Sequence, residues 1–164
     1  MQTTPDVKQA QEMNKIMSSL ESIPVTKILL TFLFYFLGGY LLYGALFGAV
    51  GAAVDNETDT QQFMLPLTIP LILSFVVAQS VVMKDPNGAL AFWLSIIPFT
   101  SPIIMMVRMP FGVPDWQLFL SIGLLILGFI FTTWLAARIY RVGILMYGKK
   151  PTYAELSKWL FFKT

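Results

Sequence analysis

Three long stretches without a charged residue constrain this chain more than any other feature of its sequence. They cover residues 28–54, 63–83 and 116–137, which are 27, 21 and 22 residues long. At about 1.5 Å per residue, each can cross a hydrocarbon core of roughly 30 Å as a helix. Only 12% of the 164 residues are charged and 56% are hydrophobic, whereas soluble domains carry roughly 25% charged residues. We therefore predict an all-α integral membrane protein with spans at about residues 28–54, 63–83 and 116–140.

A fourth uncharged stretch, residues 89–107, has Pro98 and Pro102 at its centre. Each proline removes a backbone donor and clashes with the preceding turn, at a cost of roughly 3 kcal/mol inside a helix. A re-entrant hairpin of two half-helices at about residues 89–109 avoids this cost. A fourth complete crossing would instead place the N-terminal lysines on the same side as the basic C-terminus, as the positive-inside rule prefers. The residues alone leave both topologies open and favour the hairpin.

The two ends of the chain differ in character from the membrane domain, which we place at residues 25–147. Residues 1–24 are polar with a weak amphipathic pattern and predict an interfacial helix. Residues 148–164 have the spacing of a capping box followed by an amphipathic turn, and predict a second interfacial helix. From residue 138 onwards there are six basic residues and one acidic residue, which predicts that this end is cytoplasmic.

Composition excludes several classes of function. The chain has no cysteine and no histidine, so no thiolate or imidazole mechanism is available. The predicted spans contain no carboxylate or amine that could act as a general acid or base. There is no GxxxxGK[ST] sequence to bind a nucleotide, and a net charge of +2 is too small to indicate a nucleic-acid partner. We predict no enzymatic activity and no metal or cofactor on this chain.

Small and polar residues within the first two spans suggest contacts between helices. Gly44, Gly48 and Ala52 lie one turn apart and form a stripe that lets another helix approach closely, either within the chain or from a second chain. Gln79 is a polar residue in the second span. It is a candidate for the lining of a transport path, although a hydrogen bond between helices is the commoner role.

Charged residues near the spans have simple interpretations. Asp55, Glu57 and Asp59 lie between the first two spans, but they lack the spacing, glycine and terminal glutamate of a calcium loop, so we predict a solvated loop. Arg108 is the one charge beside the predicted hairpin. We predict that it snorkels to the membrane interface, with a buried ion pair or a gate latch as the alternative.

Several motifs together resemble a known family. "GALFGAVGAAVDNETDTQQF", "LPLTIPLILS", "FWLSIIPFTSPIIMMVR" and "ARIYRVGILMYGKKPTY" follow one another along the chain. In this order they resemble the C-terminal half of type-2 ATP-binding-cassette (ABC) exporter permeases, and the likeness is closer to the NatB-like branch of that family. The resemblance extends from about residue 26 to residue 160.

The resemblance implies a topology and partners. The three spans would match the last three of six, the hairpin would be an extracellular re-entrant pair forming an outer gate, and the C-terminus would be cytoplasmic in a bacterial inner membrane. ATP and magnesium would be bound by a separate ABC ATPase subunit facing the acidic residues Asp55, Glu57 and Asp59. A second permease chain, or the missing N-terminal half, would complete the path, so the chain resembles a partial or truncated permease. The gate residues would be Pro98, Thr100, Ser101, Pro102 and Arg108.

A second hypothesis is a non-transporting membrane scaffold or assembly protein, which would use the glycine stripe to bind other transmembrane helices. The family motifs disfavour it, and the absence of the family's main cytoplasmic coupling helix favours it. No residue in the spans selects among sodium, a drug, a peptide or a lipid as the transported substrate.

Overall fold

The computed structural model describes residues 13–14, 24–54 and 57–145 of the chain, and the side chains only as far as residue 141. Both predicted interfacial helices lie outside this part, apart from three residues of the first. The described elements are α2 (Val25–Ala53), α3 (Glu57–Val77), the π-helical turn η1 (Ala78–Val82), α4 (Ala89–Ile96), α5 (Ser101–Arg108), the 3-10 turn η2 (Met109–Phe111) and α6 (Asp115–Leu145).

The prediction of an all-helical membrane protein is confirmed. Among the described residues, three helices are long and apolar enough to cross a membrane: Val25–Ala53, Glu57–Val82 and Asp115–Arg141. Their bounds agree with the charge-free stretches except at the start of α3. That helix begins at Glu57, six residues before the predicted span, so the predicted loop is shorter than expected. Glu57 and Asp59 occupy its first turn, where carboxylates interact favourably with the positive end of a helix.

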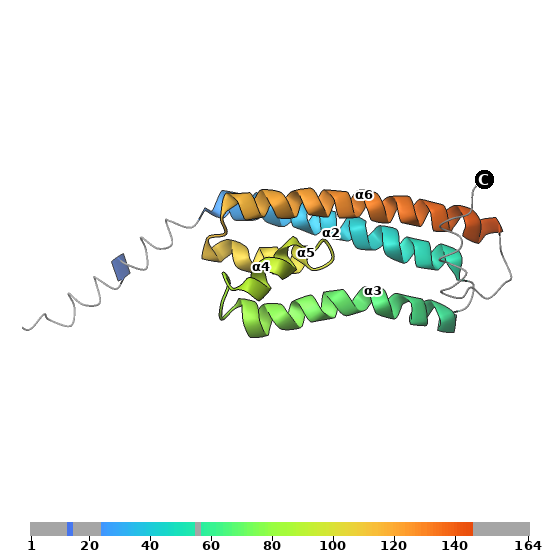
Figure 1. Cartoon of the computed structure of the whole chain (residues 1–164), viewed down its shortest axis with the longest axis horizontal. Coiled ribbons are helices and arrows are strands. Elements are labelled where there is room, and N and C mark those ends of the chain that lie inside the picture. Colours follow the sequence, from blue (N-terminus) through green and yellow to red (C-terminus); the bar gives the residue numbers. More distant parts are fainter. Residues whose placement is uncertain (1–12, 15–23, 55–56, 146–164) are drawn as a thin grey trace, which may run out of the picture.

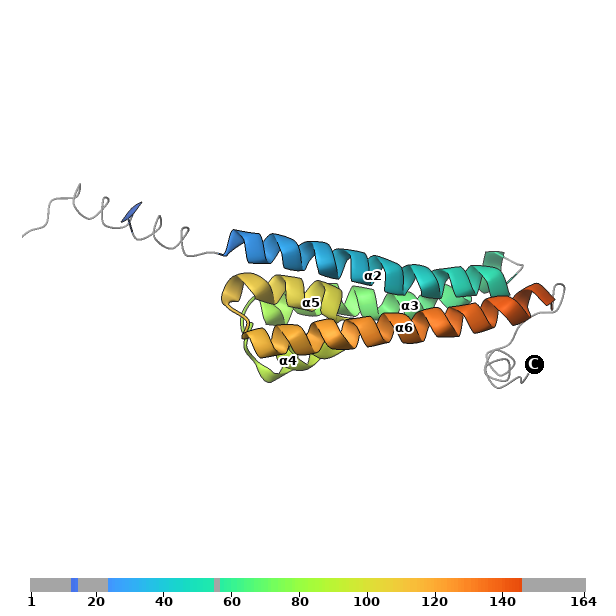
Figure 2. The same ribbon diagram turned by 90° about the horizontal axis from the view of Figure 1, so that it is seen from above.

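The three long helices form an elongated bundle (Figures 1 and 2). Helices α2 and α6 lie side by side along most of their length and run in the same direction, whereas α3 runs the opposite way. The short helices α4 and α5 fill the space between α3 and the α2–α6 pair, at the end of the bundle where α2 and α6 begin. The hairpin therefore enters and leaves at one end of the molecule.

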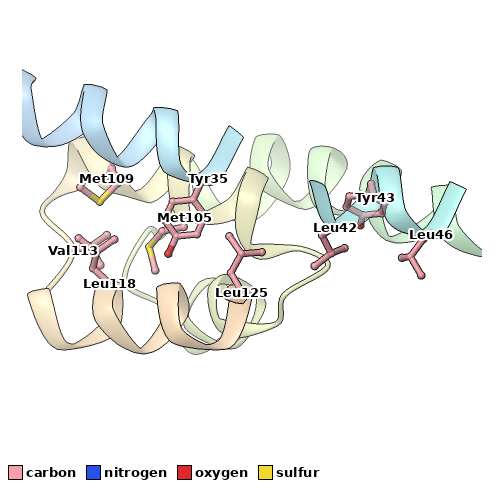
Figure 3. Close-up of a cluster of buried hydrophobic side chains, with 9 residues drawn as sticks. All are labelled: Tyr35, Leu42, Tyr43, Leu46, Met105, Met109, Val113, Leu118 and Leu125. Carbon is pink, nitrogen blue, oxygen red and sulfur yellow. The ribbon is translucent and has the colours of Figure 1, made fainter. Parts of the chain in front are cut away.

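Two buried clusters attach the hairpin to the long helices. The larger cluster joins α2 and α6 to α5 and to the segment that follows it, and Figure 3 shows its members: Tyr35, Leu42, Tyr43, Leu46, Met105, Met109, Val113, Leu118 and Leu125. The smaller cluster packs Ala78 and Val82 of η1 against Ala91 of α4 and Ile104 of α5. Gly112 ends η2 with a left-handed φ of 82°, a conformation that glycine adopts without steric cost.

Candidate functional site

The turn of the hairpin is the most unusual feature of the described chain. Helix α4 ends at Ile96 and α5 begins at Ser101, so the two prolines of the sequence lie at the turn and just after it. Each helix has eight residues and is therefore about 12 Å long, too short to cross a membrane alone. The helical path of this stretch is broken between Ile96 and Ser101, as the two prolines predict, and the re-entrant placement of the two half-helices in a membrane stays a prediction.

The backbone groups freed by this break have partners within the protein. The hydroxyl of Thr100 donates to the carbonyl of Leu94 at 2.5 Å. The carbonyl of Ile97 accepts from the amides of Thr100 and Ser101, at 3.0 and 2.8 Å. The hydroxyl of Tyr43, on α2, donates to the carbonyl of Phe99 at 2.6 Å. A break in a helix is tolerated away from water only when its carbonyls are satisfied in this way.

Two glycines on the long helices make room for the two prolines. A Cβ added at Gly39 of α2 would lie 2.9 Å from Cβ of Pro102, and one added at Gly128 of α6 would lie 2.6 Å from Cβ of Pro98. Carbon atoms in contact are normally about 3.5–4.0 Å apart, so any larger side chain at either position would displace the turn. The turn is therefore seated between α2 and α6 by close contact with backbone.

Arg108 lies at the opposite, open end of the hairpin and is fully buried. Its side chain is 1% exposed, so the prediction that it snorkels is wrong. Its Nε donates to the carbonyl of Pro86 at 2.7 Å, Nη1 to the hydroxyl of Ser95 at 2.5 Å, and Nη2 to Oε1 of Gln117 at 2.8 Å. Three neutral acceptors from different segments thus replace the water that snorkelling would have provided.

The buried charge of Arg108 and the exposed charges at this end of the bundle do not pair with one another. Burial lowers the pKa of the Arg108 guanidinium, yet the side chain stays charged, because arginine is not deprotonated in proteins. The Lys27 ammonium, at the start of α2, forms an exposed salt bridge with Asp115 at the start of α6. Among the described residues, no carboxylate forms a salt bridge with Arg108.

Serine side chains extend this polar contact into the bundle. The hydroxyl of Ser121, on α6, donates to the carbonyl of Ser95, on α4, at 2.5 Å. Ser101, at the start of α5, is fully buried, and its hydroxyl has no hydrogen-bond partner in the described part of the chain. Of the predicted gate residues, the structure thus brings Pro98, Thr100, Ser101 and Pro102 together at the turn, and Arg108 lies apart from them.

The predicted packing stripe does not mediate a close contact within the described chain. A Cβ added at Gly44 or Gly48 would meet no atom within 4 Å. Both glycines instead line an open groove of about 730 Å³ between α2 and α6, together with Ala136, Ala137 and Tyr140. Ala52 is half-buried near the end of α2. Gly38 and Gly39 make the close contacts instead. Gly38 packs against Leu125, and Gly39 packs against Pro102.

The remaining predicted residues lie away from the hairpin turn. Gln79 is in the π-helical turn η1, and its side chain is exposed on this chain. Glu57 is exposed and Asp59 is half-buried at the start of α3, at the end of the bundle remote from the hairpin. Asp55 lies outside the described residues. The roles assigned to these residues stay predictions.

Sequence reasoning did not identify several residues that position the hairpin: Tyr43, Ser95, Gln117, Ser121 and Gly128. A hydroxyl or amide in an apolar helix is a weak signal, because the same residue can bond to its own helix, as Ser74 does to the carbonyl of Pro70 at 2.5 Å. Isolated small and polar residues in α6 are the available signal in the sequence, and such residues do not reveal which group of the protein they contact.

Comparison with known proteins gives a consistent result. The sequence pattern of the family described as "ABC-2 family transporter protein" matches residues 11–138. The chain is 29% identical to the uncharacterized protein YhaP of Bacillus subtilis over 143 residues, which are 87% of this chain and 34% of YhaP. It is 27% identical to the uncharacterized protein MJ1024 of Methanocaldococcus jannaschii over 132 residues, which are 80% of this chain and 32% of that protein.

The chain spans about one third of the length of these relatives. No solved structure gives a significant match. The resemblance inferred from the motifs is confirmed at the level of the family, and the assignment to the NatB-like branch stays a prediction. Because the family pattern covers most of the described helices, including the hairpin, the chain belongs to the ABC-2 family of transporter membrane proteins.

Proposed function

We propose that this chain forms part of the permease of an ATP-driven ABC exporter, with the hairpin reaching into the translocation path from the outer side. The observation that carries the proposal is the turn at Pro98–Pro102, whose polar backbone is satisfied by protein at a depth where lipid would offer no partner. Family membership supports a permease role. A separate ATPase subunit would bind and hydrolyse ATP.

The depth of the turn follows from the helices against which it packs. Gly39 lies twelve residues along α2 from Lys27, and Gly128 lies thirteen residues along α6 from Asp115. At about 1.5 Å per residue these separations are about 18 and 20 Å. If the Lys27–Asp115 salt bridge marks one membrane surface, the turn lies slightly beyond the middle of a hydrocarbon core of roughly 30 Å.

Exposed aromatic residues on α6 support this placement in the bilayer. Trp116 and Trp134 are 59% and 51% exposed. They are eighteen residues apart, or about 27 Å along the helix, close to the thickness of the hydrocarbon core. Tryptophan is enriched at both membrane–water interfaces. Arg138 stacks on Trp134, 5.5 Å from the ring centre, as expected for a cation at an interface.

The charges beyond this second interface set the proposed orientation. Arg138 and Arg141 lie near the end of α6, and four lysines follow them in the sequence. By the positive-inside rule this end faces the cytoplasm. The mouth of the hairpin then faces outward, and the acidic start of α3 faces the cytoplasm, where the ATPase subunit would bind.

Cysteine labelling in intact cells tests this topology. The chain has no cysteine, and Asn87, at the hairpin mouth, and Gln61, near the start of α3, are both exposed. We expect a membrane-impermeant maleimide to label Asn87→Cys in intact bacterial cells and Gln61→Cys only after permeabilisation. The opposite pattern would reverse the orientation and place the hairpin on the cytoplasmic side.

The scaffold alternative rests on the open groove beside Gly44 and Gly48, because a groove lined by small residues can accept a partner helix. Affinity purification of the chain from its native membranes separates the two functions. Recovery of an ABC ATPase supports the permease, whereas recovery of other membrane proteins without an ATPase supports the scaffold.

A further inference from the structure

We propose that Arg108 is a positioning residue that fastens the open end of the hairpin to α6, so that the hairpin and α6 move as one body. The proposal goes beyond the transport role, and its test does not require transport. It also bears on the predicted outer gate. A hairpin fastened to α6 is a fixed wall of the translocation path, so any opening motion must occur at other surfaces.

The hydrogen bonds of Arg108 reach three separate segments. Pro86 lies in the turn before α4, Ser95 lies within α4, and Gln117 lies in the first turn of α6. The guanidinium is planar and has five N–H donors in a fixed arrangement. Lysine has a single nitrogen at the end of a flexible stem. Each of the three segments is held by a different nitrogen of Arg108, whereas the three donors of a lysine all lie on one nitrogen and would not reach acceptors spaced around a guanidinium.

The lack of a charged partner makes the contact depend on geometry. The three acceptors are two side-chain oxygens and one carbonyl, and the nearby Asp115 pairs with Lys27 instead. A buried charge is costly unless its donors are satisfied. If α6 moved away from the hairpin, at least one charged N–H would lose its partner in a site that water does not reach. Separation of the two elements is therefore strongly disfavoured.

Further contacts join the same two elements. The Ser121 hydroxyl donates to the carbonyl of Ser95, and the rings of Phe92 and Trp116 lie 5.7 Å apart between their centres. By contrast, η1, which continues α3, contacts the hairpin through the apolar side chains Ala78 and Val82. Such contacts are not directional and allow one surface to slide over another.

Val113 provides a reporter for this arrangement. It lies just before α6 at the open end of the hairpin and is 7% exposed. In membranes from producing cells, we expect Val113→Cys to react slowly with a maleimide. Phe63→Cys serves as a control for global unfolding, because Phe63 is buried near the start of α3, beside the end of α2 and far from the hairpin mouth.

Substitutions of Arg108 should expose the reporter selectively. We expect Arg108→Gln to raise the labelling rate of the Val113→Cys reporter at least about tenfold, because charge-assisted hydrogen bonds are lost, and to leave Phe63→Cys protected. Arg108→Lys should raise the rate similarly, since one nitrogen cannot serve three segments. Arg138→Gln, a change to an arginine at the other end of α6, should have no effect. A lysine variant with the original rate would overturn the proposal by showing that charge alone suffices.

Two matched variants of Gln117 provide a second test in case the Arg108 variants do not accumulate in membranes. Gln117→Leu removes the acceptor on α6 and should raise labelling of the Val113→Cys reporter severalfold. Gln117→Glu keeps an acceptor oxygen in the same place and should leave the rate unchanged. Equal labelling of the two variants would overturn the proposal.

A disulfide tests whether Arg108 acts only by positioning. The Ser121 hydroxyl donates to the carbonyl of Ser95 at 2.5 Å, so α4 and α6 are adjacent at these positions, and the pair Ser95→Cys and Ser121→Cys is the natural choice for a cross-link. In the Arg108→Gln background, oxidation of this pair should restore protection of the Val113→Cys reporter, and reduction should abolish it. A cross-linked protein that stays reactive at position 113 would show that fastening α4 to α6 does not replace Arg108, and would refute the proposal.

Discussion

The close contact between Gly128 and Pro98 predicts that a side chain added at position 128 would disturb the packing of the hairpin turn. In Gly128→Ala, the new Cβ would lie 2.6 Å from Cβ and 3.0 Å from Cγ of Pro98, and 3.4 Å from a methyl group of Leu42. Ordinary carbon contacts are about 3.5–4.0 Å, so the turn must move by roughly 1 Å. Overpacking of this kind costs about 1–3 kcal/mol, and the better helix propensity of alanine returns up to about 1 kcal/mol. We expect a net loss of about 1–2 kcal/mol.

The measurement is the Tm of the purified chain in detergent, followed by intrinsic tryptophan fluorescence. For a protein of this size, about 1 kcal/mol corresponds to roughly 2–4 °C, so Gly128→Ala should lower Tm by about 2–8 °C. Gly123→Ala is the matched control, because it lies on the same helix and its Cβ would meet no atom within 4 Å. If the two variants have the same Tm, close contact with the backbone of α6 does not hold the turn in place.

Three further predictions concern other contacts of the bundle. Tyr43→Phe should destabilise the chain by about 1 kcal/mol, because the Phe99 carbonyl loses its donor, and Tm in the same assay checks this. Gly48→Leu should leave Tm within about 1 °C, because a Cβ there meets no atom, but should abolish co-purification of a partner helix that occupies the groove. Lys27→Gln and Asp115→Asn should each change stability by less than about 0.5 kcal/mol, because the pair is exposed. A larger loss that disappears at high salt would show that the pair is more important than its exposure indicates.

Local features of the sequence predicted the helices and the break between them. Charge-free length is sufficient to identify α2, α3 and α6, because a membrane selects for length and apolarity alone. Pro98 and Pro102 predict the turn because proline acts on the backbone within its own neighbourhood. Polarity alone assigns Glu57 and Asp59 to a loop and so predicts too late a start for α3, because acidic residues are also favoured in a first helical turn.

The packing partners could not be predicted in the same way. Gly39 and Gly44 look alike in the sequence, yet one is seated against Pro102 and the other borders an open groove. The difference depends on which helix lies opposite, and one sequence alone does not give that pairing. Arg108 illustrates the same point, because its burial depends on acceptors that lie 22, 13 and 9 residues away along the chain.

The packing of the hairpin turn between α2 and α6 has a consequence for the order in which the chain assembles during synthesis. The turn packs against Gly39 on α2 and Gly128 on α6, so half of this packing surface does not exist until the ribosome has reached residue 128, almost halfway along α6. Helices α4 and α5, at eight residues each, are too short to be inserted as spans by the translocon. In the topology proposed above, we therefore expect the hairpin to dock only after the helix that follows it has been inserted. Docking would then be a late folding step, which a ribosome-bound chain truncated before residue 128 could not complete.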